Sequence, residues 1–102
     1  MNFFNKAAMN KAKQLQKKIM EAQAQLEQSE VTASAGGGMV TAKVNGKYRV
    51  TALTIRPEAL QEADSELLAD TVMSAINQAM ADMSAKSEST MGKLTGGLGL
   101  PF

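Results

Sequence analysis

The sequence contains no cysteine, no histidine and no tryptophan, and only four of its 102 residues are aromatic. Without cysteine the chain cannot form a disulfide framework, a thiolate nucleophile or a zinc ribbon. Without histidine it lacks the commonest general base and metal ligand. These absences argue against most classes of enzyme.

The scarcity of aromatic residues also limits the hydrophobic core. Eight methionines and many alanines supply much of the apolar share, which is 44% of the residues. A chain of this length forms about one domain. We therefore expect a small protomer that gains further apolar contact area from a second copy of the chain.

Long apolar runs are absent as well. The first residues contain no continuous run of the roughly 7–15 apolar residues that a secretory signal peptide needs. No stretch approaches the roughly 20 apolar residues of a membrane-spanning helix. We expect a soluble protein of the cytoplasm that does not associate with a membrane.

The charges nearly balance, with a formal net charge of +1, but they are separated along the chain. Residues 1–20 carry five lysines and no acidic residue, whereas residues 58–85 carry six acidic residues and no basic one. The net charge therefore conceals a strongly basic segment and a strongly acidic one.

Residues 3 to about 28 contain no glycine or proline and consist largely of strong helix formers, which predicts one long helix. Its apolar residues recur at steps of three and four, the seam of a coiled coil. The seam consists of Ala8, Ala12, Leu15, Ile19, Ala22 and Leu26. A helix of this length measures about 39 Å, against a radius of gyration of about 13 Å for a compact 100-residue fold. We expect it to project and to pair with another helix through the seam.

Three short strands follow, at residues 31–35, 39–44 and 47–55, with an apolar and polar alternation typical of a half-buried sheet. Gly36-Gly37-Gly38 predicts a turn between the first two. Asn45-Gly46 predicts a two-residue hairpin turn between the second and third. The third strand changes its alternation near Ala52-Leu53, which indicates a bulge there.

A second helix is predicted to begin at Asp64 or Ser65, since either residue can cap a helix. Its apolar stripe should cover the sheet; the stripe consists of Leu68, Val72, Ala75, Ile76, Ala79, Met80 and Met83. Residues 92–102 are predicted to form a flexible glycine-rich tail. The fold class is therefore α+β, with the order α-β-β-β-α in one domain over residues 1–91.

No pattern of catalytic or ligand-binding residues emerges. The glycines at 36–38 lack the Gly-Lys-Ser/Thr end of a phosphate-binding loop. The acidic residues lack the spacing of a calcium loop, and the methionines form no cluster that indicates copper. We predict that the protein is not an enzyme and holds no metal or cofactor.

The lysine-rich helix has two interpretations. One is a solvated face that keeps a coiled coil soluble, since charged runs most often have this role. However, solubility alone favours mixed signs of charge, and this segment carries one sign only. The alternative is a surface that contacts nucleic-acid phosphates, with weak sequence preference because lysine contacts phosphate as a point charge.

Several segments resemble a known family over essentially the whole chain. They are Val31–Gly36, Gly38–Gly46, Leu53–Leu60, Leu67–Asp70, Ala75–Ala79 and Gly97–Phe102. In this order, after a helix rich in Gln, Met and Lys, they resemble the YbaB/EbfC family of bacterial nucleoid-associated proteins. The chain departs from the pattern at Arg56, where many members carry an acidic residue before the proline.

The resemblance implies a tweezer-like homodimer joined through the sheet region, with projecting helices. It also implies binding to double-stranded DNA, a location in the nucleoid, and a role in nucleoid organisation or gene expression without cofactor or catalysis. On charge, the predicted DNA-binding residues are Lys6, Lys11, Lys13, Lys17, Lys18, Lys43, Lys47 and Arg49. The predicted dimer interface consists of Val40, Ala42, Val44, Tyr48 and Val50.

A second functional hypothesis stays open. The helical arms and the tail, which ends in the apolar segment Leu98–Phe102, would suit a protein-interaction adaptor for DNA-repair or replication machinery.

Overall fold

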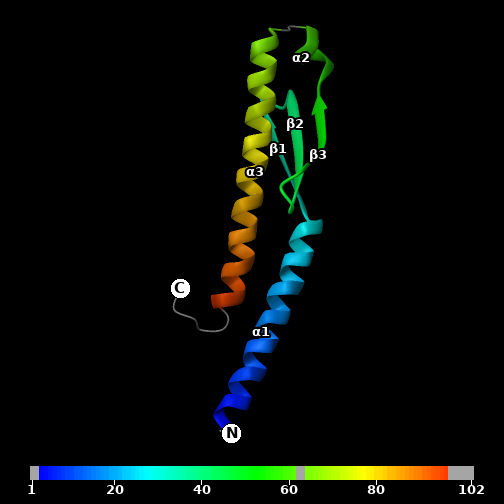
Figure 1. Ribbon diagram of the computed structural model, residues 1–102. Helices are drawn as coiled ribbons and strands as arrows, with labels where there is room; N and C mark the ends of the chain where they lie inside the picture. Colours follow the sequence, from blue (N-terminus) through cyan, green and yellow to red (C-terminus); the bar gives the residue numbers. More distant parts are fainter. Residues whose placement is uncertain (1–2, 62–63, 97–102) are drawn as a thin grey trace.

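The structure, a computed structural model, describes residues 3–61 and 64–96 (Figure 1). Its elements are α1 (Phe3–Gln28), β1 (Glu30–Ala35), β2 (Val40–Asn45), β3 (Val50–Ile55), α2 (Pro57–Gln61) and α3 (Ser65–Gly96). The predicted order α-β-β-β-α is confirmed. The short helix α2, which was not predicted from the sequence, begins at a proline because its fixed φ suits the first helical position.

The molecule is a rod rather than a sphere. Its extents are 73 × 22 × 16 Å and its radius of gyration is 20.2 Å, against about 13 Å for a compact chain of 100 residues. α2 and the start of α3 lie at one end, and the beginning of α1 lies at the other (Figure 1). The prediction that the N-terminal helix projects is confirmed.

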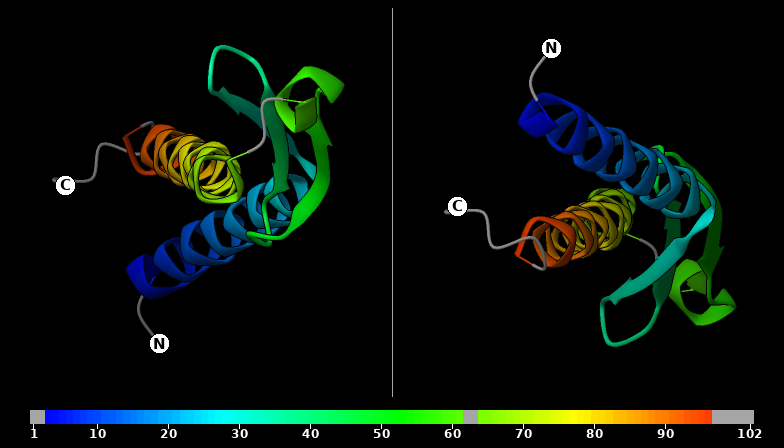
Figure 2. Two further views of the ribbon diagram at one scale, coloured as in Figure 1. Left: turned by 90° about the horizontal axis from the view of Figure 1, so that it is seen from above. Right: turned by 90° about the horizontal axis from the view of Figure 1, so that it is seen from below.

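The three strands form an antiparallel sheet in the order β1-β2-β3. Val40, Ala42 and Val44 of the central strand are fully buried, because α3 packs against this face of β1 and β2 (Figure 2). On β3, Leu53 is paired with Ala42 and Val50 with Val44, so both lie on the same face as α3. Both are nevertheless more than 40% exposed, since α3 covers mainly the other two strands.

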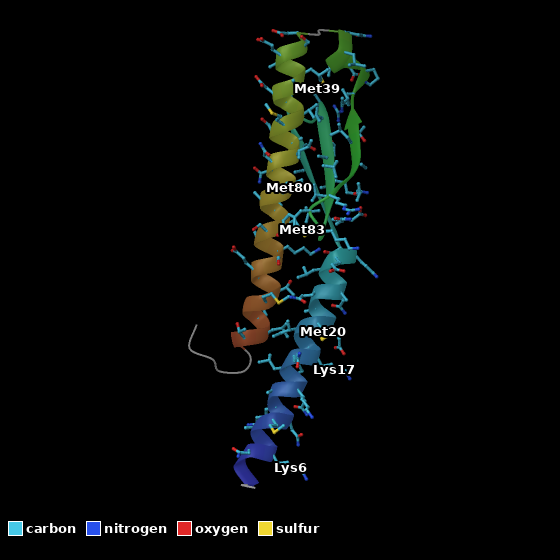
Figure 3. All side chains as sticks on the ribbon, in the orientation of Figure 1. Lys6, Lys17, Met20, Met39, Met80 and Met83 are labelled. Atoms are coloured by element: carbon cyan, nitrogen blue, oxygen red, sulfur yellow. The ribbon has the colours of Figure 1, made fainter. Side chains whose placement is uncertain are left out.

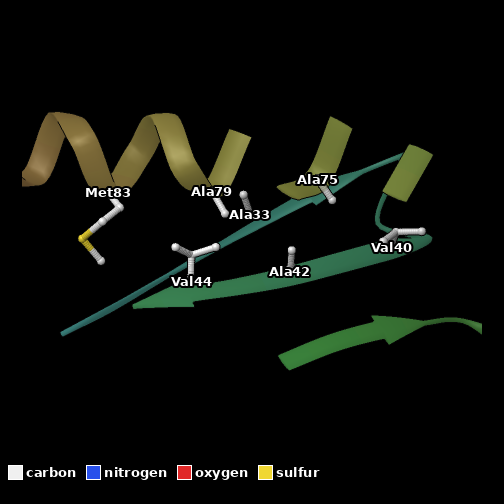
Figure 4. Packing of buried hydrophobic residues seen from close by; sticks show 7 residues of the cluster. All are labelled: Ala33, Val40, Ala42, Val44, Ala75, Ala79 and Met83. Atoms are coloured by element: carbon white, nitrogen blue, oxygen red, sulfur yellow. The ribbon is translucent and has the colours of Figure 1, made fainter. Parts of the chain in front are cut away.

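The core lies between α3 and the sheet and is built largely from small side chains (Figure 4). Ala33, Ala42, Ala75 and Ala79 face one another across this contact, and Met83 closes one end of it. All seven apolar residues predicted for the stripe of α3 belong to this core or pack against it. The predicted cover of the sheet is therefore confirmed.

The hairpin between β2 and β3 lies where it was predicted, but its geometry differs. The backbone N–H of Tyr48 donates to the carbonyl of Asn45, and Tyr48 has a positive φ of 60°. The loop therefore has three residues, and the prediction of a two-residue Asn-Gly turn is wrong. The Asn45 carboxamide oxygen accepts the N–H groups of Lys47 and Arg49, which stabilises the longer loop.

Gly46 is required because the hairpin approaches α1 closely, not because of a two-residue turn. Its N–H donates to the Ser29 carbonyl at the end of α1, and a Cβ atom built on it would overlap the backbone of Leu26. The absence of a side chain thus allows the hairpin to lie directly against the end of α1. The β2–β3 hairpin therefore helps to hold the C-terminal end of α1 in place.

Three further local features can be compared with the predictions. The β-bulge lies at Thr51, one residue before the predicted position, because Lys43 pairs with Ala52 and Val44 with Val50. Asp64 is the cap of α3, since its carboxylate accepts the N–H of Glu66 at 2.9 Å. The prediction of a loop-forming glycine turn at 36–38 is confirmed, with positive φ at all three positions.

α3 continues through residues 92–96, which were predicted to belong to the tail. A single glycine in a helix costs only about 1 kcal/mol. The Thr95 hydroxyl donates to the Met91 carbonyl within the same helix at 3.2 Å. Gly92 therefore does not end the helix, and the remainder of the predicted tail, residues 97–102, lies outside the described residues.

Replacing Gly46 with alanine should destabilise the protein by about 1–3 kcal/mol, because the added methyl group cannot be accommodated beside Leu26 without a backbone shift. Urea denaturation followed by circular dichroism measures this change. Gly92→Ala is the control: nothing lies within 4 Å of its added Cβ, so the helix should gain about 1 kcal/mol. Equal effects of the two substitutions would contradict the proposed close approach.

Met83 is 1% exposed and Met73 is 55% exposed, although both belong to α3. Met83→Ala should therefore lower the free energy of unfolding by about 2–5 kcal/mol through loss of buried area and a residual cavity. Met73→Ala should change it by about 0.5 kcal/mol or less. The same denaturation experiment compares them, and a similar loss in both would show that this core is wrongly placed.

Candidate nucleic-acid interface

α1 contacts α3 only through its C-terminal half. A shallow groove between the two helices is lined by Lys18, Ala22 and Gln25 of α1 together with Thr90 and Lys93 of α3. Because Lys18 is level with Lys93, the residues before it extend past the end of α3 (Figure 1). The first part of α1 is therefore an arm; we use this name for residues 3–17.

The predicted seam of α1 is divided by this arrangement. Leu26 is buried, whereas Leu15 and Ile19 are only half-buried and Ala8 and Ala12 are exposed. The C-terminal half of the seam thus lies beside α3 of the same chain. On the arm, Ala8 and Ala12 remain open and Leu15 is partly covered.

All five lysines of α1 are exposed, and the helix arranges them in two rows. At about 100° per residue, Lys6, Lys13 and Lys17 lie within about 40° of one another, on the side opposite the seam. Figure 3 shows Lys6 and Lys17 pointing away from α3. Lys11 and Lys18 form the second row, about 20° apart and closer to the seam.

The other predicted DNA-binding residues do not join these rows. Lys47 and Arg49 are exposed in the hairpin beside the end of α1, and Lys43 is half-buried on the face of the sheet opposite α3. Lys18 and Ser29, where the hairpin meets α1, are separated by about 16 Å along the helix. The structure therefore gives a basic arm and a separate basic hairpin, rather than one continuous patch.

The structure also brings together basic residues that were not predicted from the sequence. Lys93 lies across the helix groove from Lys18, and Lys86 lines the adjoining part of the same groove with Gln25 and Ser29. Nothing in the local sequence of α3 distinguishes these two lysines. Only the antiparallel packing of α1 and α3 places them beside the basic helix.

A group of acidic residues lies at the far end of the rod. Glu58 belongs to α2, and Asp64, Glu66 and Asp70 lie at or near the start of α3, remote from the arm. The separation of charge along the sequence is thus also a separation along the long axis of the molecule. An anionic ligand is attracted to one end and repelled by the other.

The residues predicted for the dimer interface fall into two groups. Val40, Ala42 and Val44 are fully buried inside the protomer by α3, so their side chains are not available to a second chain in this fold. Tyr48 and Val50 are 45% and 42% exposed at the edge strand. The strand alternation could not distinguish these groups, because it does not show how far a covering helix reaches across a sheet.

Other kinds of site find little support in the described part of the chain. Within residues 3–61 and 64–96, no three acidic side chains gather as metal ligands would, and no helix is long and apolar enough to cross a membrane. An apolar groove of about 270 Å³ lies between the glycine turn and the start of α3. The tail segment Leu98–Phe102, on which the adaptor hypothesis depends, lies outside the described residues.

The chain is similar to known proteins over most of its length. The profile of the YbaB/EbfC DNA-binding family matches residues 1–98. A nucleoid-associated protein of Clostridium perfringens is 48% identical over 93 residues, which cover 91% of this chain and 83% of the relative. One from Alkaliphilus metalliredigens is 43% identical over 93 residues, covering 91% and 82%. The family and these relatives are named as DNA-binding or nucleoid-associated proteins and not as enzymes. These names agree with the prediction that the protein is not an enzyme.

A solved structure supports the fold independently. The crystal structure of an uncharacterized protein, HP0035 from Helicobacter pylori, superposes with a TM-score of 0.70 at 21% sequence identity. The match covers 92% of this chain and 97% of that one. The family model and the relatives together show that the chain belongs to the YbaB/EbfC DNA-binding family.

Proposed function

We propose that this protein binds double-stranded DNA mainly through phosphate contacts from the lysines of α1, and that it is a nucleoid-associated protein of the cytoplasm. Membership of a DNA-binding family and the names of its relatives support this proposal. In the cell, such binding would affect nucleoid organisation or gene expression.

The observation that carries the proposal is the basic arm. It projects from the body of the molecule, its lysines are exposed, and no acidic residue occurs among residues 1–20. Lysine ammonium groups neutralise phosphates and release the cations condensed on DNA. Because the acidic end and the arm lie at opposite ends of the rod, DNA bound to the arm is far from the acidic residues of that end. This separation allows a chain of nearly zero net charge to bind a polyanion.

The salt dependence of binding tests which lysines take part. Each lysine that contacts a phosphate should contribute about 0.9 to the slope of log K against log salt concentration. The variant Lys6→Gln/Lys13→Gln/Lys17→Gln should therefore bind a labelled duplex more weakly, with a slope reduced by up to about 2.7 for each arm that contacts the duplex. Fluorescence anisotropy at several salt concentrations measures both quantities.

Arg56→Gln provides the control, since Arg56 is exposed near the glycine turn, towards the acidic end. Its removal should leave affinity and slope nearly unchanged. A triple variant that binds as the parent protein does would contradict the assignment of DNA binding to the arm. A variant with Lys86→Gln and Lys93→Gln would then show whether the helix groove binds DNA instead.

We also propose that the protein is a homodimer and that β3 forms its interface. β3 is an edge strand, and Val50, Leu53 and Tyr48 expose between 42% and 45% of their surface beside unpaired backbone groups. Edge strands of monomeric proteins usually carry charges or proline that prevent association. Here the edge carries apolar side chains, which favours contact with a second sheet.

Leu53→Lys should shift the protein from dimer to monomer at micromolar concentration, because it places a charge within the proposed apolar contact. Sedimentation velocity measures the change. Leu60→Lys is the matched control, since Leu60 is 55% exposed but belongs to α2, and it should leave the dimer intact. A parent protein that sediments as a folded monomer would refute the dimer.

A further inference from the structure

On the arm, a third row of side chains lies between the two lysine rows of α1. It consists of Ala7, Asn10 and Gln14, which are all exposed. At about 100° per residue, this middle row lies roughly 60–70° from the centre of each lysine row. The arm therefore presents two carboxamides with positive charge on both sides.

This arrangement matches the cross-section of the DNA major groove. The groove is about 12 Å wide and admits one α-helix, whose diameter with side chains is about 10–12 Å. A helix lying in the groove turns its middle row towards the base edges and its two flanks towards the two phosphate backbones. On the arm, the middle is Asn10 and Gln14, and Lys11 supplies one flank. The other flank carries Lys6, Lys13 and Lys17. Lys18 continues the Lys11 flank just beyond the arm, where it lines the helix groove.

The residue types in the middle row suit particular bases. The carboxamide of Asn or Gln can accept from adenine N6 and donate to N7 in the same plane, and the alanine methyl group can contact the thymine methyl group. Lysines on the flanks position the helix without reading sequence. We infer that the arm enters the major groove, that Asn10 and Gln14 read base edges there, and that the protein prefers sites containing A·T pairs.

Two features of α1 define the extent of this surface. Glu21 continues the middle row two turns further on, but it lies beside α3 in the helix groove. An acidic side chain is repelled by phosphate, so the base-facing part ends before it. The centre of the seam lies about 130° from the centre of the middle row, so a helix packed on the seam leaves the base-facing row free.

This inference depends on the proposed function, since it requires DNA binding by the arm. The test begins with selection of preferred duplexes from a random pool by the full chain. Anisotropy then compares a selected duplex with one in which its A·T pairs are replaced by G·C. We expect the parent protein to bind the selected duplex at least about fivefold more tightly. In Asn10→Ala/Gln14→Ala this ratio should fall to about one, with G·C affinity changed by less than about twofold.

The arm offers a matched control that carries the same two residue types. Asn5 and Gln16 are exposed on the opposite side of the helix, so Asn5→Ala/Gln16→Ala should keep the full preference. Circular dichroism shows whether each variant keeps its helix content. Lys13→Gln, by contrast, should weaken binding to both duplexes by the same factor.

The outcomes separate this inference from the function on which it depends. Tight, salt-sensitive binding without base preference would overturn the role of Asn10 and Gln14 and leave the proposed function intact. Equal loss of the preference in both double variants would overturn that role in the same way. Failure to bind any duplex would overturn the proposed function, and the inference with it.

Discussion

The close packing of α3 against β1 and β2 is the contact on which the rest of the structure depends. Four of the seven buried residues in this core are alanines, so the helix and the sheet approach each other without large side chains between them. Each small side chain buries little apolar area, so this contact depends on a close fit between the helix and the strands along its length. Because it covers two strands of three, the apolar side of β3 is left exposed.

The same contact explains why α1 is free to act as an arm. Among the described residues, the core between α3 and the sheet contains none from α1, so the helix is held only near its C-terminal end. There Leu26 is buried, Gly46 lies against the helix backbone, and Ser29 accepts a hydrogen bond from the hairpin. A long helix fixed at one end places its lysines well away from the body, where they are exposed to solvent.

The elongated shape keeps basic and acidic groups of residues apart along the long axis of the molecule. The basic arm and the acidic end lie at opposite ends of a rod 73 Å long, several times the Debye length of about 8 Å at physiological ionic strength. The two ends therefore act on their surroundings almost independently. Net charge is consequently a poor guide to the partners of this protein, and the distribution of charge is a good one.

The sequence by itself determined the two long helices, the strand order, the stripe of α3 and the basic character of α1, because these depend on local propensity and on periodic patterns. It predicted the wrong geometry for the hairpin. The requirement for a glycine at position 46 comes from the backbone of Leu26, which is distant in the sequence. The sequence also assigned Val40, Ala42 and Val44 to an interface, because alternation shows which face is apolar but not what covers it. The tertiary structure alone decided these points, and it alone placed Lys18 and Lys93 on the same groove. Each depends on how segments far apart in the chain pack together.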